Sequence, residues 1–314
     1  MLLRTGQFTF PTPPEQLFGR RAPLVLEIGF GDGCFLVDLA SRHPEWNLLG
    51  VEISPGSVRR ARRRILQAGL QNVRLYLGQA RFLVRNVLPP RSLHCVYVNF
   101  PDPWPKERHR ERRLLQPAFF ALLSTRLEAA GTLRLTTDDA PYFSFALEAA
   151  QQTGLFRVEV TDPPPETLQT KYARKWQAQK KSIYHAVFHK VAEADDLFLP
   201  TIERYDVMHH AVLEGELPKP EHFEKLVHAF EGGHVILLAA YRALDDSGLL
   251  FLARIEEEEL VQEVLLEVAP RDSHVLVRVL PFGLPLSTRG TREAIRCLSS
   301  WLEAQGMRLR EMFF

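Results

Sequence analysis

The sequence has little cysteine and no long apolar run, and both shortages exclude classes of protein. Its three cysteines, Cys34, Cys95 and Cys297, lie far apart without a Cys-x-x-Cys pair, so neither a disulfide framework nor a zinc site is expected. The longest apolar run, about Val235–Tyr241, is too short to cross a membrane, and Met1–Phe10 lacks the apolar core of a secretion signal. We therefore expect a cytoplasmic protein without a membrane partner or a bound metal.

The near-neutral total charge conceals a strong asymmetry along the chain. The formal net charge of all 314 residues is +1. Residues 1–191 carry 27 Lys and Arg against 16 Asp and Glu, a net +11, whereas residues 192–314 carry 12 against 22, a net −10. A basic region favours a polyanionic partner, because binding phosphates releases condensed counterions. The charge therefore predicts that the first region, and not the second, binds a polyanion.

Strand and helix patterns alternate through the first region. An apolar run at Leu24–Ile28 leads into the loop Gly29-Phe30-Gly31-Asp32-Gly33 and then into a helical period. Further strands are expected at 47–52, 73–77, 93–99, 132–137, 156–160 and 182–191, with helices at 35–40, 55–69, 81–87, 114–127 and 140–152. This alternation predicts an α/β fold with a Rossmann-type, mostly parallel sheet whose ligands bind at the carboxyl ends of the strands.

The second region has a different pattern. A helix is expected at about 221–230, then four strands at 234–242, 249–255, 260–268 and 275–280, a helix near 292–303 and a last apolar segment. Consecutive strands joined by short polar turns predict an antiparallel sheet. We therefore expect a first domain at 1–191 and a smaller, acidic α+β domain at 192–314, whose role the sequence does not reveal.

The loop after the first buried strand favours a methyl-donor site. Gly29, Gly31 and Gly33 permit a tight turn and let a ligand approach the backbone. Their spacing departs from the dinucleotide fingerprint, and Glu27 leads into the loop, which argues against a nicotinamide dehydrogenase. An S-adenosylmethionine donor carries a sulfonium cation, which acids around the site would stabilise.

Polar residues also follow the next three predicted strands. Glu52 ends the second strand, where a carboxylate can accept hydrogen bonds from a ribose diol, although dehydrogenases have an acid there too. Gln79 follows the third strand and would face the adenine of the donor. Asn99 ends the fourth strand, and Asp102 lies just beyond it, where the transferred methyl group should emerge. The four strand ends therefore predict one cleft.

A proline-rich segment follows that fourth strand. Asn99-Phe100-Pro101-Asp102-Pro103-Trp104-Pro105-Lys106 is followed at once by Arg108, Arg110, Arg112 and Arg113. Each proline fixes its own backbone and pushes the preceding residue toward an extended shape. The segment thus puts an acid and an indole in a rigid turn beside arginines. This favours a functional site, with a solvated arginine-rich turn as the alternative.

Together these motifs resemble the bacterial tRNA (guanine-N7-)-methyltransferase family. The matching segments, in the family's order over residues 24–190, are 27–33, 50–53, 99–106 with the following arginines, 137–138 and 170–172. The resemblance implies a class I methyltransferase fold in the first domain. It also implies methyl transfer from S-adenosylmethionine to the N7 atom of a variable-loop guanosine in tRNA. It does not cover the acidic second domain.

The resemblance and the strand-end positions together assign expected roles. Donor contacts are expected from Glu27, Gly29, Gly31, Glu52, Gln79, Asn99 and Asp102, and substrate contacts from Lys106, Arg110, Arg113, Asp138, Thr170, Lys171 and Tyr172. Lys106, Arg110 and Arg113 would hold phosphates without reading sequence. Two positions depart from the family pattern, because Gln79 stands where an acid is usual and Ala173 where Glu is usual.

Methyl transfer to guanine N7 calls for positioning rather than for a general base, because this atom carries a lone pair and no proton. Alignment can lower such a barrier by on the order of several kcal/mol. Asp102 is the predicted catalytic residue, since a carboxylate would stabilise the positive charge that the purine gains. The same carboxylate could instead bind the donor or the guanine edge.

Several alternatives stay open at this point. Trp104 either stacks on the target base or covers the core under its loop, and the arginine run at 59–64 is either solvated surface or an RNA contact. As a whole, the chain could be another class I RNA or protein methyltransferase, or a non-catalytic RNA-binding protein that retains a donor pocket.

Overall fold

A computed structural model describes residues 1–165, 167–169 and 181–314 and divides the chain into two compact units. The first unit consists of Met1–Leu3 and Phe8–Pro200, and the second of Arg4–Gln7 and Thr201–Phe314. In the sequence, the main segments of the two units therefore join between Pro200 and Thr201, and the short segment Arg4–Gln7 also belongs to the second unit. The assignment of separate roles to residues 1–191 and 192–314 stays a prediction.

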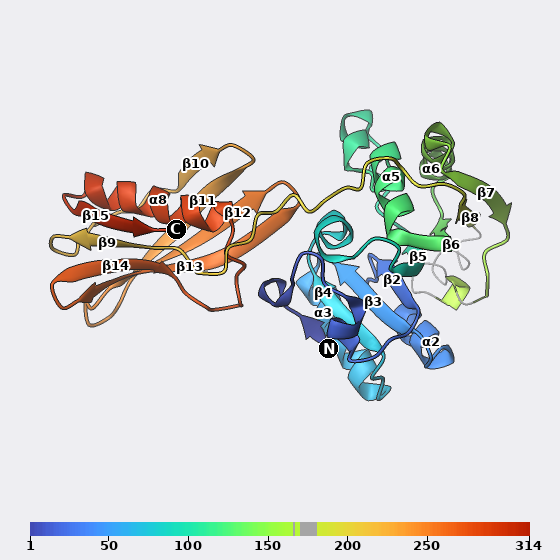
Figure 1. Cartoon of the computed structure of the whole chain (residues 1–314), viewed down its shortest axis with the longest axis horizontal. Coiled ribbons are helices and arrows are strands. Elements are labelled where there is room, and N and C mark those ends of the chain that lie inside the picture. The colour runs from blue at the N-terminus through green and yellow to red at the C-terminus, as the bar shows by residue number, and fades with distance from the viewer. Residues whose placement is uncertain (166, 170–180) are drawn as a thin grey trace. The chain divides into compact units, whose positions relative to one another are not determined.

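The first unit is built on an eight-stranded sheet (Figure 1). Its strands are β1 (Leu2–Leu3), β2 (Leu24–Ile28), β3 (Asn47–Glu52), β4 (Val73–Leu77), β5 (Leu93–Asn99), β6 (Leu127–Thr137), β7 (Phe156–Thr161) and β8 (Tyr184–Lys190). In the order β1-β4-β3-β2-β5-β6-β8-β7, neighbours are parallel up to β6, and β8 is antiparallel to both β6 and β7. The expected Rossmann-type, mostly parallel sheet is thereby confirmed.

Helices connect these strands and bury the middle of the sheet. They are α1 (Pro14–Phe18), α2 (Cys34–Arg42), α3 (Pro55–Gln67), α4 (Ala80–Phe82) with a π-helical turn at Leu83–Val87, α5 (Pro117–Arg126) and α6 (Ala140–Thr153). Every residue of β2 is buried, as a parallel strand covered on both faces should be. Ser54 caps α3 by accepting a hydrogen bond from the Ser57 amide, and Pro55 is the first residue of the helix.

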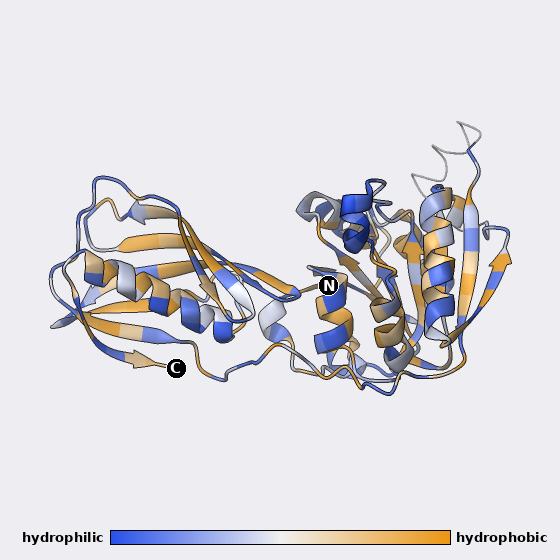
Figure 2. Cartoon of the chain, turned by 90° about the horizontal axis from the view of Figure 1, so that it is seen from above, coloured by the Kyte–Doolittle hydropathy of each residue, from blue (hydrophilic) through white to orange (hydrophobic). Residues whose placement is uncertain are grey.

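The second unit is a seven-stranded antiparallel sheet with one long helix. Its strands are β9 (His210–Glu214), β10 (Leu226–Phe230), β11 (Gly233–Arg242), β12 (Leu249–Glu257), β13 (Leu260–Arg271), β14 (His274–Val279) and β15 (Arg308–Phe313), in the order β10-β11-β12-β13-β14-β9-β15. Helix α8 (Arg289–Ala304) packs with the sheet around one apolar core. Apolar residues concentrate on the strands of both units in Figure 2. The expected α+β class is confirmed.

The helix expected at 221–230 is wrong. Phe223, Leu226, Val227 and Phe230 have helical spacing, but the chain forms strand β10 there, which pairs antiparallel with β11. The ladder fixes a period of two, so that Val227 is 56% exposed while Leu226 and Phe230 pack against the core. Strand β9, for which the sequence carries no clear signal, fills the gap between β14 and β15.

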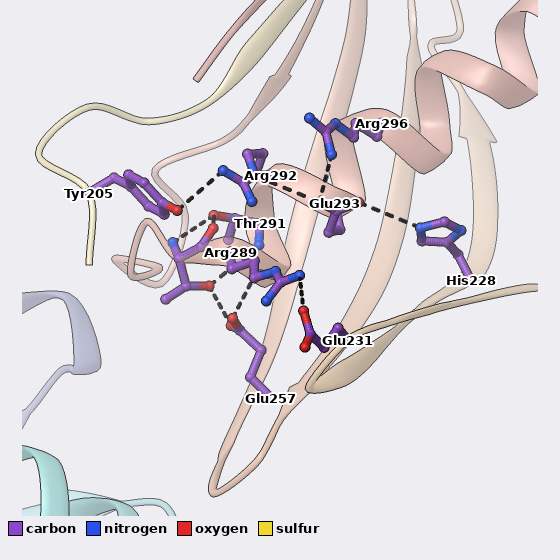
Figure 3. Close-up of polar contacts among 11 residues, drawn as sticks. Tyr205, His228, Glu231, Glu257, Arg289, Thr291, Arg292, Glu293 and Arg296 are labelled. Atoms are coloured by element: carbon purple, nitrogen blue, oxygen red, sulfur yellow. Dashed lines mark hydrogen bonds and ion pairs between the residues drawn. The ribbon is translucent and has the colours of Figure 1, made fainter. Parts of the chain in front are cut away.

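Helix α8 begins at a buried carboxyl group. Glu257, at the end of β12, accepts hydrogen bonds from the Thr288 hydroxyl and, at 2.7 Å, from the Gly290 amide (Figure 3). Thr288 caps the helix in a reciprocal arrangement with Thr291. A Cβ atom at Gly290 would lie 2.4 Å from Ile255 Cγ2, so only glycine allows this close approach. Burial raises the pKa of Glu257. The carboxyl group thus ties the sheet to the start of the helix.

We predict that Glu257→Ala will destabilise the second unit by about 2–4 kcal/mol, because the buried Thr288 hydroxyl and Gly290 amide lose their partner. Glu256→Ala is the matched control. Its partner is Arg254, both side chains are more than 40% exposed, and the expected loss is below about 1 kcal/mol. Urea unfolding, with hydrogen exchange of the α8 amides to identify the transition, measures both losses. Equal losses would contradict this role for Glu257.

Candidate active site

The carboxyl ends of four parallel strands meet at a cavity of about 350 Å³. Gly29 and Gly31 after β2, Glu52 at the end of β3, Gly78 after β4 and Asp102 after β5 all line it. A smaller cavity of about 100 Å³ shares both glycines and is also lined by Glu27, Asp32 and Asn99. The structure therefore brings together most of the donor-binding residues selected from the sequence, whose roles stay predictions.

The glycine loop is held tightly against α3. Gly33 has a φ of +77°, and a Cβ atom there would lie 2.5 Å from Ala61 Cβ, so a side chain would push the helix away. Asp32 accepts a hydrogen bond from the Cys34 amide at 3.2 Å, and it pairs with Arg64 of α3 at 2.9 Å. These contacts fix the course of the backbone along the cavity wall.

The carboxylate of Glu52 is oriented by backbone amides. Its Oε2 atom accepts a hydrogen bond from Gly31 at 3.0 Å, and its Oε1 atom accepts from Ile53 at 2.9 Å and from Ser54 at 3.0 Å. Each carboxylate oxygen has two lone-pair directions, so its two amides fill Oε1 and one direction remains free on Oε2. Such a group can accept a hydrogen bond from a ligand hydroxyl without first having to be ordered.

Glu27 is an acid buried in the middle of the sheet. It is 2% exposed, and its Oε1 atom accepts one long hydrogen bond, at 3.4 Å, from Asn99 on the neighbouring strand β5. Its Oε2 atom has no partner among the described residues. Burial raises the pKa of Glu27 to about 8, and the nearby Glu52 and Asp32 also raise it. The carboxyl group therefore either keeps a proton or meets a cationic ligand.

The loop that carries Asp102 is rigid and strained. Phe100 and Trp104 have φ values of +52° and +45°, a backbone region that residues other than glycine rarely adopt. Arg113, only 7% exposed, donates to the Pro103 carbonyl at 3.0 Å and to the Trp104 carbonyl at 3.4 Å. Asp102 itself is exposed and lines the larger cavity. The loop thus presents one carboxylate at a fixed place beside that cavity.

The phosphate contact expected from Arg113 is contradicted by this arrangement. Its guanidinium is buried, donates to two loop carbonyls and lies 4.8 Å from the Phe145 ring centroid. A phosphate could reach it only if the loop opened. Arg110 remains accessible, with an ion pair to Glu107 at 3.1 Å, and Lys106 is exposed. Arg113 therefore positions the loop, because it donates hydrogen bonds to two of the loop carbonyls. Neighbouring arginines of this turn point in different directions.

The remaining predicted site residues fall into two groups. Gln79 is exposed between Gly78 and Ala80, which both line the larger cavity, and Asp138 lies 3.9 Å from Lys181. Thr170, Lys171 and Tyr172, together with Ala173, lie outside the described residues. The substrate contacts assigned to these positions stay predictions.

Sequence reasoning missed several residues of the cavity wall, namely Ile53, Ser57, Arg112 and Leu114. Ile53 is 69% exposed and directly follows Glu52. Its position just after a strand end could have indicated that it lines the cavity. Arg112 lies over the Trp104 ring at 5.0 Å. Its neighbours in the sequence give no sign that Arg112 faces the cavity while Arg113 turns inward.

The described residues offer neither a metal cluster nor a membrane-spanning helix. No cluster of three or more His, Cys, Asp or Glu side chains there is placed to hold a metal ion. Among the helices described, none is long and apolar enough to cross a membrane.

Known proteins resemble this chain over most of its length. A family model described as putative methyltransferase matches residues 21–186, all within the first unit. A tRNA (guanine-N(7)-)-methyltransferase of Thermus thermophilus is 50% identical over 94% of both chains. One of Deinococcus radiodurans is 42% identical over 98% of both chains. A third, from Halorhodospira halophila, is 43% identical over 55% of this chain and 78% of its own.

We predict that Glu27 makes the stability of the ligand-free protein depend on pH. A raised pKa in the folded state contributes stability below the ordinary pKa of 4.5, and this contribution is lost as the pH rises through about 8. Glu27→Gln removes the dependence. The free energy of unfolding of the variant minus that of the wild type should therefore be larger at pH 8.5 than at pH 5. The expected increase is on the order of 2–4 kcal/mol. Urea unfolding at the two pH values measures this difference, and parallel pH profiles would refute the prediction.

Proposed function

The chain belongs to the tRNA (guanine-N(7)-)-methyltransferase family, and on that basis we propose that it transfers a methyl group from S-adenosylmethionine to N7 of the variable-loop guanosine in tRNA. One observation supports this most strongly. Two adjoining cavities at the ends of parallel strands are lined by Glu27, Glu52 and Asp102. These acids suit a cationic nucleoside donor, and the exposed Asp102 suits an acceptor that approaches from outside.

The residues around the cavities fit this donor. When bound, S-adenosylmethionine supplies a methyl group activated by a sulfonium. Glu52, held by three backbone amides, would accept a hydrogen bond from a hydroxyl of the ribose. Glu27 has a buried oxygen without a partner among the described residues, and an ammonium group would satisfy it. Gln79, at a position where the family resemblance implies an acid, would offer its side-chain carbonyl to the adenine amino group.

Asp102 acts by position. Guanine N7 needs no deprotonation, so the contribution of the protein is to hold this atom in line with the methyl group. Methyl transfer moves positive charge onto the purine, and a preorganised carboxylate stabilises that charge without moving. Arg113 keeps the loop in place through the Pro103 and Trp104 carbonyls, so the carboxylate is ordered before the substrate arrives.

The tRNA would be held around this loop. Lys106 and Arg110 are exposed beside Asp102, where they can contact phosphates and orient the RNA. We also assign substrate contacts to Asp138 and to the segment Thr170–Tyr172, as the family resemblance implies. A base engaged in the tertiary structure of tRNA must be locally exposed before it can reach the cavity.

The nucleobase specificity can be tested directly. An unmodified tRNA transcript should accept a labelled methyl group, and nucleoside analysis should find it on N7 of guanosine. The same transcript with adenosine in place of the variable-loop guanosine should remain unlabelled, because the reacting atom and its surroundings are changed. Equal labelling of the two transcripts would refute the proposed target.

We predict that Asp102→Asn will lower kcat by about a hundredfold or more, with the Kd for tRNA within about threefold of wild type. The substitution keeps the size of the side chain but removes the charge that opposes the developing cation. Asp195→Asn, at an exposed position away from both cavities, serves as the control and should leave kcat unchanged. Single-turnover methylation and filter binding separate the two quantities. A large loss of affinity with an unchanged kcat would overturn the assignment.

A further inference from the structure

The arginines of α3 have two different environments. Arg60 donates to the Ser57 hydroxyl at 3.0 Å, and Arg64 pairs with Asp32 at 2.9 Å, so both support the cavity wall. The other three, Arg59, Arg62 and Arg63, have no hydrogen-bond or ion-pair partner in the described part of the chain. The helix therefore carries three cations that no acid of the described chain neutralises.

These three arginines line one groove of about 480 Å³, which we call the three-arginine groove. Its other lining residues are Leu2, Pro55, Val58, Leu66, Gln67 and Leu77. No acidic side chain lines it. Leu66 is 59% and Leu77 37% exposed, so the groove combines cationic walls with an apolar surface that is open to solvent. A ligand that suits it has anionic groups and an apolar face, as a nucleotide chain does.

The arginines of α8, by contrast, have acidic partners. Arg289 pairs with Glu231 at 3.0 Å, and Arg296 pairs with Glu293 at 3.0 Å (Figure 3). On α3, Arg59 has Arg62 and Arg63 three and four residues away, and like charges at these spacings destabilise a helix by a few tenths of a kcal/mol each. An external polyanion would remove this repulsion.

One end of the groove lies at the same edge of the sheet as the active site. Pro55, which lines the groove, follows Glu52 by three residues, and Leu77 directly precedes Gly78 of the larger cavity. In the sheet, β4 lies on one side of β2 and β5 lies on the other, so the groove and the Asp102 loop flank the donor cavity. An RNA that places a base at Asp102 can therefore extend across this edge to α3.

We propose that the three-arginine groove binds the phosphodiester backbone of the tRNA at a distance from the target nucleotide, with a ribose or base face on Leu66 and Leu77. This inference deepens the proposed function and rests on it. The arginines contact phosphates as charges and read no sequence, so the groove contributes affinity and orientation. Catalysis at a bound guanosine does not require them.

The test compares three variants of the full-length protein. The test variant is Arg59→Gln/Arg62→Gln/Arg63→Gln. The charge-retaining variant replaces the same arginines with lysine. The control is Arg21→Gln/Arg42→Gln/Arg157→Gln, which removes the same net charge at positions before β2, before β3 and at the start of β7. These positions lie at the opposite edge of the sheet, because they precede or begin strands that run in the same direction.

The test variant should bind unmodified tRNA about tenfold more weakly. Its plot of log affinity against log salt should be shallower by about two to three, because each lost phosphate contact removes about one unit of slope. The lysine variant should keep most of the wild-type slope, and the control should stay within about twofold in affinity. Donor binding, followed by calorimetry, and kcat at saturating tRNA should be unchanged in the test variant.

The outcomes separate this inference from the proposed function. Equal losses in the test and control variants, or an unchanged salt slope in the test variant, would overturn the groove as a binding site. If the wild type methylates no tRNA although the test variant alone loses tRNA binding, the proposed activity fails and the groove stands. If methylation occurs as proposed and the test variant keeps full affinity, the groove inference fails alone.

Discussion

A parallel sheet covered on both faces can present polar side chains to a ligand only where its strands end, and the active site depends on this constraint. Glu27 is the sharpest case. It lies in β2, where every residue is buried, and the neighbouring strand offers it only the Asn99 amide. An acid in that position is costly unless a proton or a cationic ligand accompanies it. The fold thereby favours a positively charged donor before any substrate is considered.

The proposed function also requires a fixed carboxylate at the mouth of the cavity. Proline restricts the loop around Asp102, and Arg113 secures it through two backbone carbonyls. The strained φ values of Phe100 and Trp104 persist because the surrounding contacts maintain them. This rigidity suits a reaction whose nucleophile is already a free lone pair. On the proposed mechanism, the chain lowers the barrier by geometry and charge and needs no group that accepts a proton.

Much of the fold follows from local pattern, since β3, β4 and β5 begin and end where their apolar runs do. The positions of Glu52 and Asp102 were equally predictable. Glu52 ends β3 and Asp102 follows β5, and the carboxyl ends of parallel strands meet at one edge of the sheet. Two features were not predictable. Residues 221–230 have helical spacing, and only pairing with β11 makes Leu226–Phe230 a strand. The other feature is the direction in which arginine side chains point. Tertiary contacts decide that Arg113 turns inward while Arg112 faces the cavity, and they decide which α3 arginines have partners. Adjacent positions in a sequence do not reveal such contacts.

The account rests on a cationic nucleoside donor bound at the ends of β2, β3 and β4, with its reactive group turned toward Asp102. A crystal structure of the protein with S-adenosylhomocysteine tests this most directly. We expect the ribose within hydrogen-bond distance of Glu52, the ammonium group beside Glu27 and the sulfur on the side of Asp102. Density for the ligand at any other place, with both cavities empty, would contradict the account.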